Sequence, residues 1–222
     1  MVDAAGHLLQ PGARRGDEAR ATAVEPPAAA LATIDERCAS MAATQHAVRA
    51  LFTGGTFCYE AQLAFNARGL PCRSNAPTHD SLPFDGRFDG HVMLDLGDDD
   101  YTRGRPHPMI DPSVRDAMVR AQGADPNTAA ILFDVVLGYG AHADPAQSLA
   151  SALADAQVQA RAQRRTLALI GHVCGTEGDP QDRAAQMRLL QEVGAILADS
   201  NIEAALLAVH CAHRCTTRRT RG

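Results

Sequence analysis

The sequence contains no lysine, no long apolar run and no basic region large enough to define a domain, and each absence excludes a class of function. All 21 basic residues in the 222-residue chain are arginine, so it has no lysine for a phosphate-binding P-loop, a Schiff base or general-base catalysis. Its longest apolar run, Ala204–Val209, is far shorter than the roughly 20 residues needed to span a bilayer. The formal net charge of −5 argues against nucleic acid as the main partner. We therefore expect a soluble protein with neither a nucleic-acid nor a membrane partner.

The N-terminus and the cysteines both indicate a cytoplasmic location. Residues Met1–Gln10 lack the cationic start and the following apolar stretch of a secretory signal. The cysteines are scattered rather than paired at short spacing, so in a reducing cytosol they are interpreted as buried hydrophobes or free thiols. They are Cys38, Cys58, Cys72, Cys174, Cys211 and Cys215.

Composition divides the chain into a leader, one folded unit over residues 47–209 and a tail. Residues 1–46 are rich in alanine, glycine and proline, which predicts a weakly structured leader with a short helix from Ile34 to about Ala43 as an option. Residues 210–222 carry four arginines and no acidic residue, which predicts a solvated basic tail. The histidines and cysteines of that tail have no second cluster at structural-zinc spacing, so no metal site is predicted.

The folded unit alternates short β-rich runs with longer amphipathic stretches, which predicts an α/β fold. Five such cycles imply an open parallel five-stranded sheet with right-handed crossovers and helices on both faces. Aspartate-proline pairs at 111–112, 144–145 and 179–180 predict helix starts, and Gly69, Gly123 and Gly194 predict helix ends. The predicted strands are Ala47–Phe52, Val92–Leu96, Ala129–Val136, Thr166–Val173 and Ala195–Ala198.

Candidate ligand-binding residues follow the strands, because ligands of open parallel sheets bind beyond the carboxyl ends of the strands. The segment Thr53–Thr56 after the first strand combines two glycines with a helix start, whose free N–H groups favour an anion; a tight turn is the alternative interpretation. The aspartates at 98–100 are interpreted either as oxygen ligands of a cation or as a solvated turn. We expect the substrate to contact Thr53, Gly54, Gly55, Thr56, Asp98, Arg105, Gly138, Gly140, Gly175 and Thr176.

Two residues of the same loops are candidate catalytic groups. His107 stands between two prolines, which favours a positioned imidazole, and we expect it to act as a general base. Glu177 follows the fourth strand and is expected to line the same cleft. Cys174 is either a nucleophile with a lowered pKa or a buried inert thiol.

Four ordered motifs resemble FdrA proteins of the acyl-CoA synthetase superfamily, which are relatives of the succinyl-CoA synthetase α subunit. The motifs are LFTGGTFCYEA at 51–61, DLGDDDYTRGRPHPMID at 95–111, ILFDVVLGYGAH at 131–142 and HVCGTEGDP at 172–180. The resemblance implies a flavodoxin-like ligase domain, which in the whole family protein follows an N-terminal CoA-binding Rossmann domain. Only 46 residues precede the first strand, so the chain resembles a partial family member. CoA or nucleotide is expected only where a Rossmann partner domain is supplied.

The resemblance also carries expectations about chemistry. In synthetases a histidine on a glycine-rich insertion after the fourth strand carries phosphate, and a glutamate after the third strand orients it. Here the insertion is missing after His172, and Val136 stands at the glutamate position, so phosphohistidine chemistry is not expected. Gly54, Gly55 and Thr56 match the segment whose helix start holds the phosphoryl group.

Two functions remain open at the sequence level. FdrA-like proteins are associated with oxamate carbamoyltransferase, which implies a subunit that binds an acyl-phosphate, a carbamoyl-phosphate or a carboxylate together with partner subunits. The alternative is a non-catalytic binding or assembly module that retains only the fold.

Overall fold

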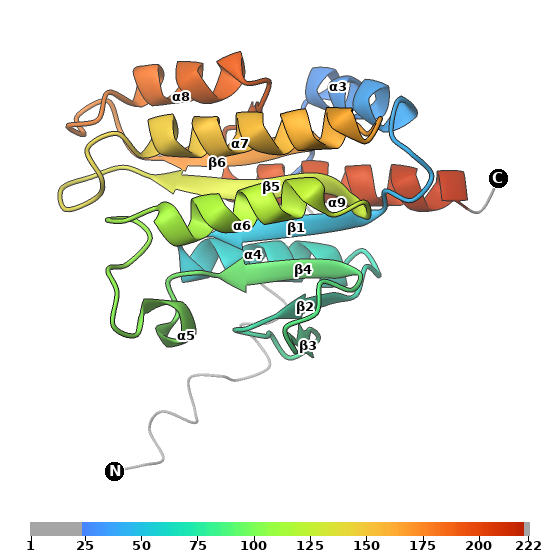
Figure 1. The fold of residues 1–222 in the computed structure, drawn as a ribbon, viewed down its shortest axis with the longest axis horizontal. Helices are drawn as coiled ribbons and strands as arrows, with labels where there is room; N and C mark the ends of the chain where they lie inside the picture. The colour runs from blue at the N-terminus through green and yellow to red at the C-terminus, as the bar shows by residue number, and fades with distance from the viewer. Residues whose placement is uncertain (1–23, 220–222) are drawn as a thin grey trace, which may run out of the picture.

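The computed structural model describes residues 24–219, and a single parallel sheet lies at the centre of this region. The strand order is β3-β2-β4-β1-β5-β6-β7, and every neighbouring pair is parallel (Figure 1). The strands are β1 (Ala47–Phe52), β2 (Cys72–Ser74), β3 (Leu82–Pro83), β4 (His91–Asp95), β5 (Thr128–Val136), β6 (Ala168–Cys174) and β7 (Ile196–Ala198).

The five predicted strands are confirmed as β1, β4, β5, β6 and β7, but the sheet has seven strands rather than five. The five predicted strands are arranged in the order 2-1-3-4-5, which is the flavodoxin-like order. The two additional strands, β2 and β3, have three and two residues, too few to show an alternating pattern in sequence. Both extend the sheet beyond β4, and Pro83 is tolerated because β3 is an edge strand.

Helices cover both faces of the sheet, as predicted. One face packs against α3 (Ala28–Ala39), α4 (Gly55–Asn66) and α9 (Asn201–Arg219), and the other against α6 (Ser113–Ala124), α7 (Pro145–Ala162) and α8 (Arg183–Glu192). In Figure 1 α6 and α7 lie in front of the sheet and α8 lies above them, with α4 and α9 behind the sheet. Strand side chains alternate between the two cores: Phe52 packs on the first face and Leu51 on the second. None of the helices within residues 24–219 combines the length and apolarity of a membrane span.

The predicted helix boundaries are confirmed at some positions and wrong at others. Asp144 caps α7 by accepting a hydrogen bond from the Gln147 amide at 3.3 Å, with proline at the first turn. Asp179 instead binds the Thr176 amide and hydroxyl, so α8 begins later, with Asp182 as its cap.

Of the three glycines predicted to end helices, two do so and one does not. Gly69 and Gly194 adopt the expected positive φ angles of 69° and 79°. Gly123 lies inside α6, where an added Cβ would approach the Ala156 Cα to 2.5 Å. The lack of a side chain there allows α6 and α7 to pack closely, and it is this contact that requires glycine.

The structure differs from the expected weakly structured leader and solvated tail. Residues 28–39 form α3, and α9 continues to Arg219 instead of ending near residue 209. The two segments bury each other's apolar side chains, including Ile34, Cys38 and Cys211, each at most 1% exposed. Arg218 adds hydrogen bonds to the carbonyls of Cys38 and Met41. The remaining parts of the predicted leader and tail, residues 1–23 and 220–222, lie outside the described residues.

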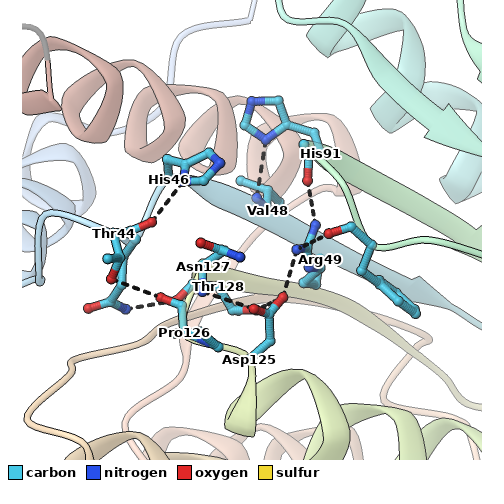
Figure 2. A network of polar contacts seen from close by, with 12 residues as sticks. Thr44, His46, Val48, Arg49, His91, Asp125, Pro126, Asn127 and Thr128 are labelled. Atoms are coloured by element: carbon cyan, nitrogen blue, oxygen red, sulfur yellow. Dashed lines mark hydrogen bonds and ion pairs between the residues drawn. The ribbon is translucent and has the colours of Figure 1, made fainter.

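A buried polar network connects the amino ends of β1, β4 and β5 (Figure 2). The fully buried Arg49 donates to the carbonyls of Phe88, at 2.8 Å, and Gly90, and forms an ion pair with Asp125 at 2.7 Å. His91 Nδ1 accepts a hydrogen bond from the Val48 amide at 3.1 Å. Because these contacts compensate the buried guanidinium charge, the network has a structural role at the end of the sheet opposite the predicted site.

Candidate functional site at the carboxyl ends of the central strands

The carboxyl ends of β4, β1 and β5 meet at one edge of the sheet, with β1 in the middle. The chain leaves β1 toward β4 on one side, and β5 lies on the other, so this edge is the topological switch point at which doubly wound sheets bind ligands. Three segments converge there: the loop Thr53–Gly54 that opens α4, Asp95 at the end of β4, and Asp134 near the end of β5.

The Asp134 carboxylate fills one half of the predicted anion-binding loop. It accepts hydrogen bonds from the Thr53 amide at 2.7 Å, the Thr53 hydroxyl at 2.8 Å and the Gly54 amide at 3.0 Å. Its side chain is fully buried, and the buried Arg115 donates to the Asp134 backbone carbonyl at 2.9 Å. The expectation that Thr53 and Gly54 offer free amides to a ligand is therefore corrected, because an internal carboxylate already occupies them.

The pKa of Asp134 reflects opposing influences. Burial raises it above the ordinary value for aspartate, whereas the Arg115 charge and the Thr53 donors act in the opposite direction. Sequence reasoning did not select Asp134, although it lies inside the quoted motif at 131–142. One signal in the sequence could have identified Asp134, since it is an acidic residue within an otherwise apolar strand. A carboxylate buried in such a strand requires hydrogen-bond donors nearby.

The two glycines of the loop are required by neighbouring side chains. A Cβ at Gly54 would lie 2.9 Å from the Phe57 ring and 3.4 Å from Asp134 Oδ2. A Cβ at Gly55 would lie 2.6 Å from Asp95 Oδ2. The glycines therefore permit close approach of the two aspartates on either side of the α4 start.

The other half of the loop remains open. Gly55 and Thr56 are exposed, and within the described residues neither backbone amide donates a hydrogen bond. They are the first two residues of α4, a 12-residue helix. Free N–H groups at a helix start carry partial positive charge, so these two amides can donate to an anionic or carbonyl oxygen.

Asp95 is a second carboxyl group that sequence reasoning missed. Its Oδ1 accepts from the Gly97 amide at 2.9 Å, and its backbone N–H and C=O both bond the Asn75 side chain at 2.9 Å. Burial raises the pKa of Asp95, and the nearby charges of Asp98 and Asp134 raise it further. Asp95 is therefore a fixed carboxyl group beside Gly55 that takes up a proton more readily than an ordinary aspartate.

His107 reaches the same edge, but its hydrogen bonding differs from that of the expected base. A Cβ at Gly97 would overlap His107 Nε2 and lie 3.0 Å from the Thr53 carbonyl oxygen, so the imidazole lies over Gly97 next to the loop. Its Nδ1 accepts from the Met109 amide at 3.2 Å. A neutral imidazole that accepts at Nδ1 carries its proton on Nε2, so the atom nearest the loop is a donor.

The second-strand candidates Asp98 and Arg105 do not join this cluster. Asp98 accepts from the Asp100 amide at 3.0 Å and caps α5 (Asp99–Thr102), which agrees with the turn interpretation rather than a cation ligand. Arg105 is exposed, and its charge acts on Asp111.

The glycines predicted to contact substrate after β5 and β6 have structural roles or lie in solvent. Both the N–H and the C=O of Gly138 are bonded to the Gln181 side chain, at 3.0 and 2.8 Å. Gly140 is exposed at a φ of 88°. Gly175 makes room for Leu137, whose Cβ would lie 2.7 Å from an added Cβ.

The polar candidates after β6 are directed to local partners. The amide and hydroxyl of Thr176 both bond Asp179. The Glu177 side chain is 75% exposed and faces Arg183 at 3.8 Å. The structure thus brings together Thr53, Gly54, Gly55, Thr56 and His107 and leaves the other predicted residues outside the cluster.

Strand β6 also carries His172, which is not expected to carry phosphate, and Cys174, the candidate nucleophile. His172 Nδ1 lies 3.1 Å from the Ala198 carbonyl oxygen, and its ring makes an edge contact with Phe57. Burial raises the pKa of the half-buried Cys174 thiol, and nearby Asp134 and Asp179 raise it further. This environment disfavours the thiolate, so it supports the inert thiol over the nucleophile.

Comparison with known proteins identifies a family and a relative. A family model described as CoA-ligase matches residues 51–211. An Escherichia coli K12 protein described as uncharacterized protein YahF is 37% identical over 166 residues, which cover 74% of this chain and 32% of that protein. The chain therefore spans about a third of the length of this relative.

Proposed function

Because this chain belongs to the CoA-ligase family, we propose that it is a ligase-like α-subunit domain of FdrA type that binds a small carboxylate substrate at the start of α4. The observation that carries the proposal is the pair of open amides at Gly55 and Thr56, placed beside Asp95 at the switch point of the sheet. The sequence motifs shared with FdrA proteins support the same site, since LFTGGTFCYEA contains both residues.

The chemistry of the site follows from the hydrogen-bond donors that surround it. The Gly55 and Thr56 amides donate to the substrate oxygens, and the protonated form of Asp95 donates a third hydrogen bond. His107 presents Nε2–H toward the same loop and serves as a donor to a carbonyl oxygen rather than as a base. Charge-assisted bonds of this kind are about twice as strong as neutral ones.

The charges at the start of α4 distinguish between an acyl-phosphate, a carbamoyl-phosphate and a carboxylate as substrate. A helix start carries about half a positive charge, and the Asp134 carboxylate already lies against it. A phosphate dianion would be repelled by that carboxylate, whereas a monoanionic carboxylate or an uncharged carbamoyl oxygen would be repelled less. The proposal therefore favours a carboxylate such as oxamate over an acyl-phosphate, with carbamoyl phosphate bound through its carbonyl end.

The complete activity requires more than this chain. Gly55 and Thr56 are exposed, so a neighbouring subunit or domain is needed to exclude water from the bound substrate. Oxamate carbamoyltransferase is the activity that the FdrA resemblance favours, and CoA or nucleotide would be held by a Rossmann partner domain. A cytoplasmic location is part of the proposal, and the six free cysteines support it.

The occupied half of the loop favours a second candidate function. Because Asp134 satisfies the Thr53 and Gly54 amides internally, the domain is also suited to act as a non-catalytic assembly module. In that case Gly55 and Thr56 bind solvent, and the fold serves only to contact partner subunits.

Amide-resolved NMR titration distinguishes the two functions. Oxamate, carbamoyl phosphate and inorganic phosphate are added separately, and the Gly55 and Thr56 amide shifts are followed. The substrate proposal predicts saturable shifts at these two amides, with oxamate binding more tightly than phosphate. Unchanged amides at all accessible concentrations would support the assembly module.

A matched pair of glycine variants gives the control. Gly55→Ala places a Cβ 2.6 Å from Asp95 Oδ2, whereas Gly178→Ala is an exposed loop change whose nearest contact, Thr176 Oγ1, lies at 3.7 Å. Oxamate binding should be lost in the first variant and unchanged in the second. Turnover of carbamoyl phosphate and oxamate is then measured with the chain alone and with its partner subunits, and activity in the mixture only is the expected result.

A further inference from the structure

Three cysteines from opposite ends of the sequence meet between α3 and α9. Cys38 comes from α3, and Cys211 and Cys215 lie one helical turn apart on α9. Their Sγ atoms all lie within 4.8 Å of one another, and the Cys38 and Cys211 sulfurs are 3.5 Å apart. None of the three residues is more than 4% exposed. This thiol cluster lies apart from the residues assigned to the substrate site.

A fourth sulfur lies beside Cys215. Met41, 3% exposed, lies just after α3, and its Sδ is 3.5 Å from Cys215 Sγ. The four side chains therefore offer three thiol groups and one thioether. Tetrahedral or trigonal coordination with metal–sulfur bonds of about 2.3 Å needs sulfurs about 3.8–4.0 Å apart, so the three thiols require shifts of up to about an ångström to reach that geometry.

The other buried cysteines of the same core have different surroundings. Cys58 Sγ lies 3.7 Å from the Ser74 hydroxyl, and Cys72 Sγ lies 3.4 Å from the Ser81 hydroxyl. Each of these thiols lies against a hydroxyl group, whereas each thiol of the cluster has another sulfur atom among its neighbours; the Cys38 thiol also lies 3.9 Å from the Cys211 carbonyl oxygen. Cys72 is therefore a matched control: a buried cysteine on the same side of the sheet, outside the cluster.

We propose that Cys38, Cys211 and Cys215 form a binding site for a soft monovalent cation of the Cu(I) class, with Met41 as a fourth sulfur donor. Thiolate and thioether ligands prefer soft cations. Zinc fits less well, because its usual protein ligands are thiolate, imidazole and carboxylate, and the fourth donor here is a thioether. Each coordinating thiol releases its proton to solvent when the cation binds.

The surroundings provide charge compensation and access. Three thiolates and one monovalent cation leave an excess of negative charge, and the Arg218 guanidinium lies beside them, bonded to the Cys38 and Met41 carbonyls. A cavity of about 230 Å³ is lined by Cys215 and Arg218 together with Ala42, Ala43 and Gln45. It gives a cation a route to the Cys215 thiol without unfolding α9.

The test uses the full chain, reduced and kept under anaerobic conditions. Cu(I) is supplied as its acetonitrile complex and competed against the chromophoric chelator bicinchoninate, and Zn²⁺ is measured in a parallel competition. The variants are Cys211→Ala, Met41→Leu and the control Cys72→Ala, each checked by circular dichroism and thermal melting without metal. Cysteine alkylation followed by mass spectrometry reports which thiols the cation protects, and this readout needs no variant.

The expected result is one Cu(I) per chain, with Cys38, Cys211 and Cys215 protected from alkylation and Cys72 unaffected. Cys211→Ala should weaken binding by about 100-fold or more, since even outer contacts of a metal ligand change affinity by about 10- to 100-fold. Met41→Leu should weaken it less, and Cys72→Ala should not change it. Equal binding in Cys211→Ala and wild type, protection of other thiols, or tighter binding of zinc than of Cu(I) would each overturn the proposal.

Discussion

Removing the Asp134 carboxylate tests the central feature of the site, which is that an internal anion occupies half of the loop. Asp134→Ala deletes the acceptor of three hydrogen bonds, from the Thr53 amide and hydroxyl and from the Gly54 amide. The Thr53 hydroxyl can rotate to another partner, but the two backbone donors are fixed by β1 and α4. The variant therefore leaves two donors without a partner at a site where Thr53 is only 2% exposed.

The expected loss of stability follows from those two donors. The Thr53 amide is buried, and a buried donor left unsatisfied costs about 1–3 kcal/mol, whereas the half-buried Gly54 amide costs less because water reaches it more easily. Removing a buried carboxylate also relieves its desolvation, while the fully buried Arg115 loses a nearby opposite charge. Arg115 keeps its ion pair with Asp116 at 3.8 Å, so we expect the free energy of unfolding to fall by about 2–4 kcal/mol, mainly through the unsatisfied donors. Asp134→Asn keeps one acceptor oxygen and should lose about half of this.

Urea unfolding followed by far-ultraviolet circular dichroism is the appropriate assay, since the chain contains no tryptophan for fluorescence. The control is Asp155→Ala, which removes an exposed ion pair with Arg120 at 2.8 Å and should cost at most about 1 kcal/mol. Adding inorganic phosphate then tests whether an external anion replaces the missing carboxylate. A ligand at ten times its Kd stabilises the folded state by about 1.4 kcal/mol, and this gain should be larger in Asp134→Ala than in wild type.

Two results would refute the reasoning. The first is a loss below about 1 kcal/mol in Asp134→Ala, similar to that of Asp155→Ala, because the carboxylate would then contribute little to the loop. The second is an equal phosphate effect on wild type and Asp134→Ala, because the vacated amides would then offer no additional anion site.

Three other predictions concern pH, packing and the substrate site. Burial lowers the pKa of His91 to about 4, from 6.5 for the free side chain. The unfolded chain therefore binds a proton at a higher pH than the folded protein does. The free energy of unfolding should fall by up to about 3 kcal/mol as the pH drops from 6.5 to 4. His91→Asn should flatten this slope in urea titrations at several pH values. Gly123→Ala should destabilise the fold by about 1–3 kcal/mol, measured by thermal melting, because the new methyl group would meet Ala156 at 2.5 Å; an unchanged melting temperature would contradict the close packing of α6 and α7. Oxamate affinity should decrease as the pH rises through the raised pKa of Asp95, because the proton donor is lost, and calorimetry on Asp95→Asn should show no such dependence.

Local sequence signals determined much of the fold. Alternation of β-rich runs with amphipathic stretches identified β1, β4, β5, β6 and β7 to within about two residues, because strand and helix periodicity are properties of adjacent residues. Capping by Asp144 was likewise predictable, since its partner is three residues away. The motifs quoted from the sequence also lie within the region that matches the CoA-ligase family.

The candidate site was predicted only in part. Thr53, Gly54, Gly55 and Thr56 do open α4 at the switch point, as the glycines and the strand end indicated. The sequence could not show that Asp134, 81 residues from Thr53, would occupy two of the amides. His107 was identified as a positioned imidazole, but its tautomer depends on the Met109 amide and hence on the local loop geometry.

Features built from residues distant in sequence were decided by the tertiary structure alone. Strands β2 and β3 are too short to be periodic; β2 exists because it pairs with the edge of β4, and β3 because it pairs with β2. Residues in the predicted leader and tail looked polar or featureless separately, yet α3 and α9 bury Cys38 and Cys211 against each other across 173 positions. Composition and periodicity report the preferences of single segments, whereas burial and side-chain partnership depend on which segments the fold brings into contact.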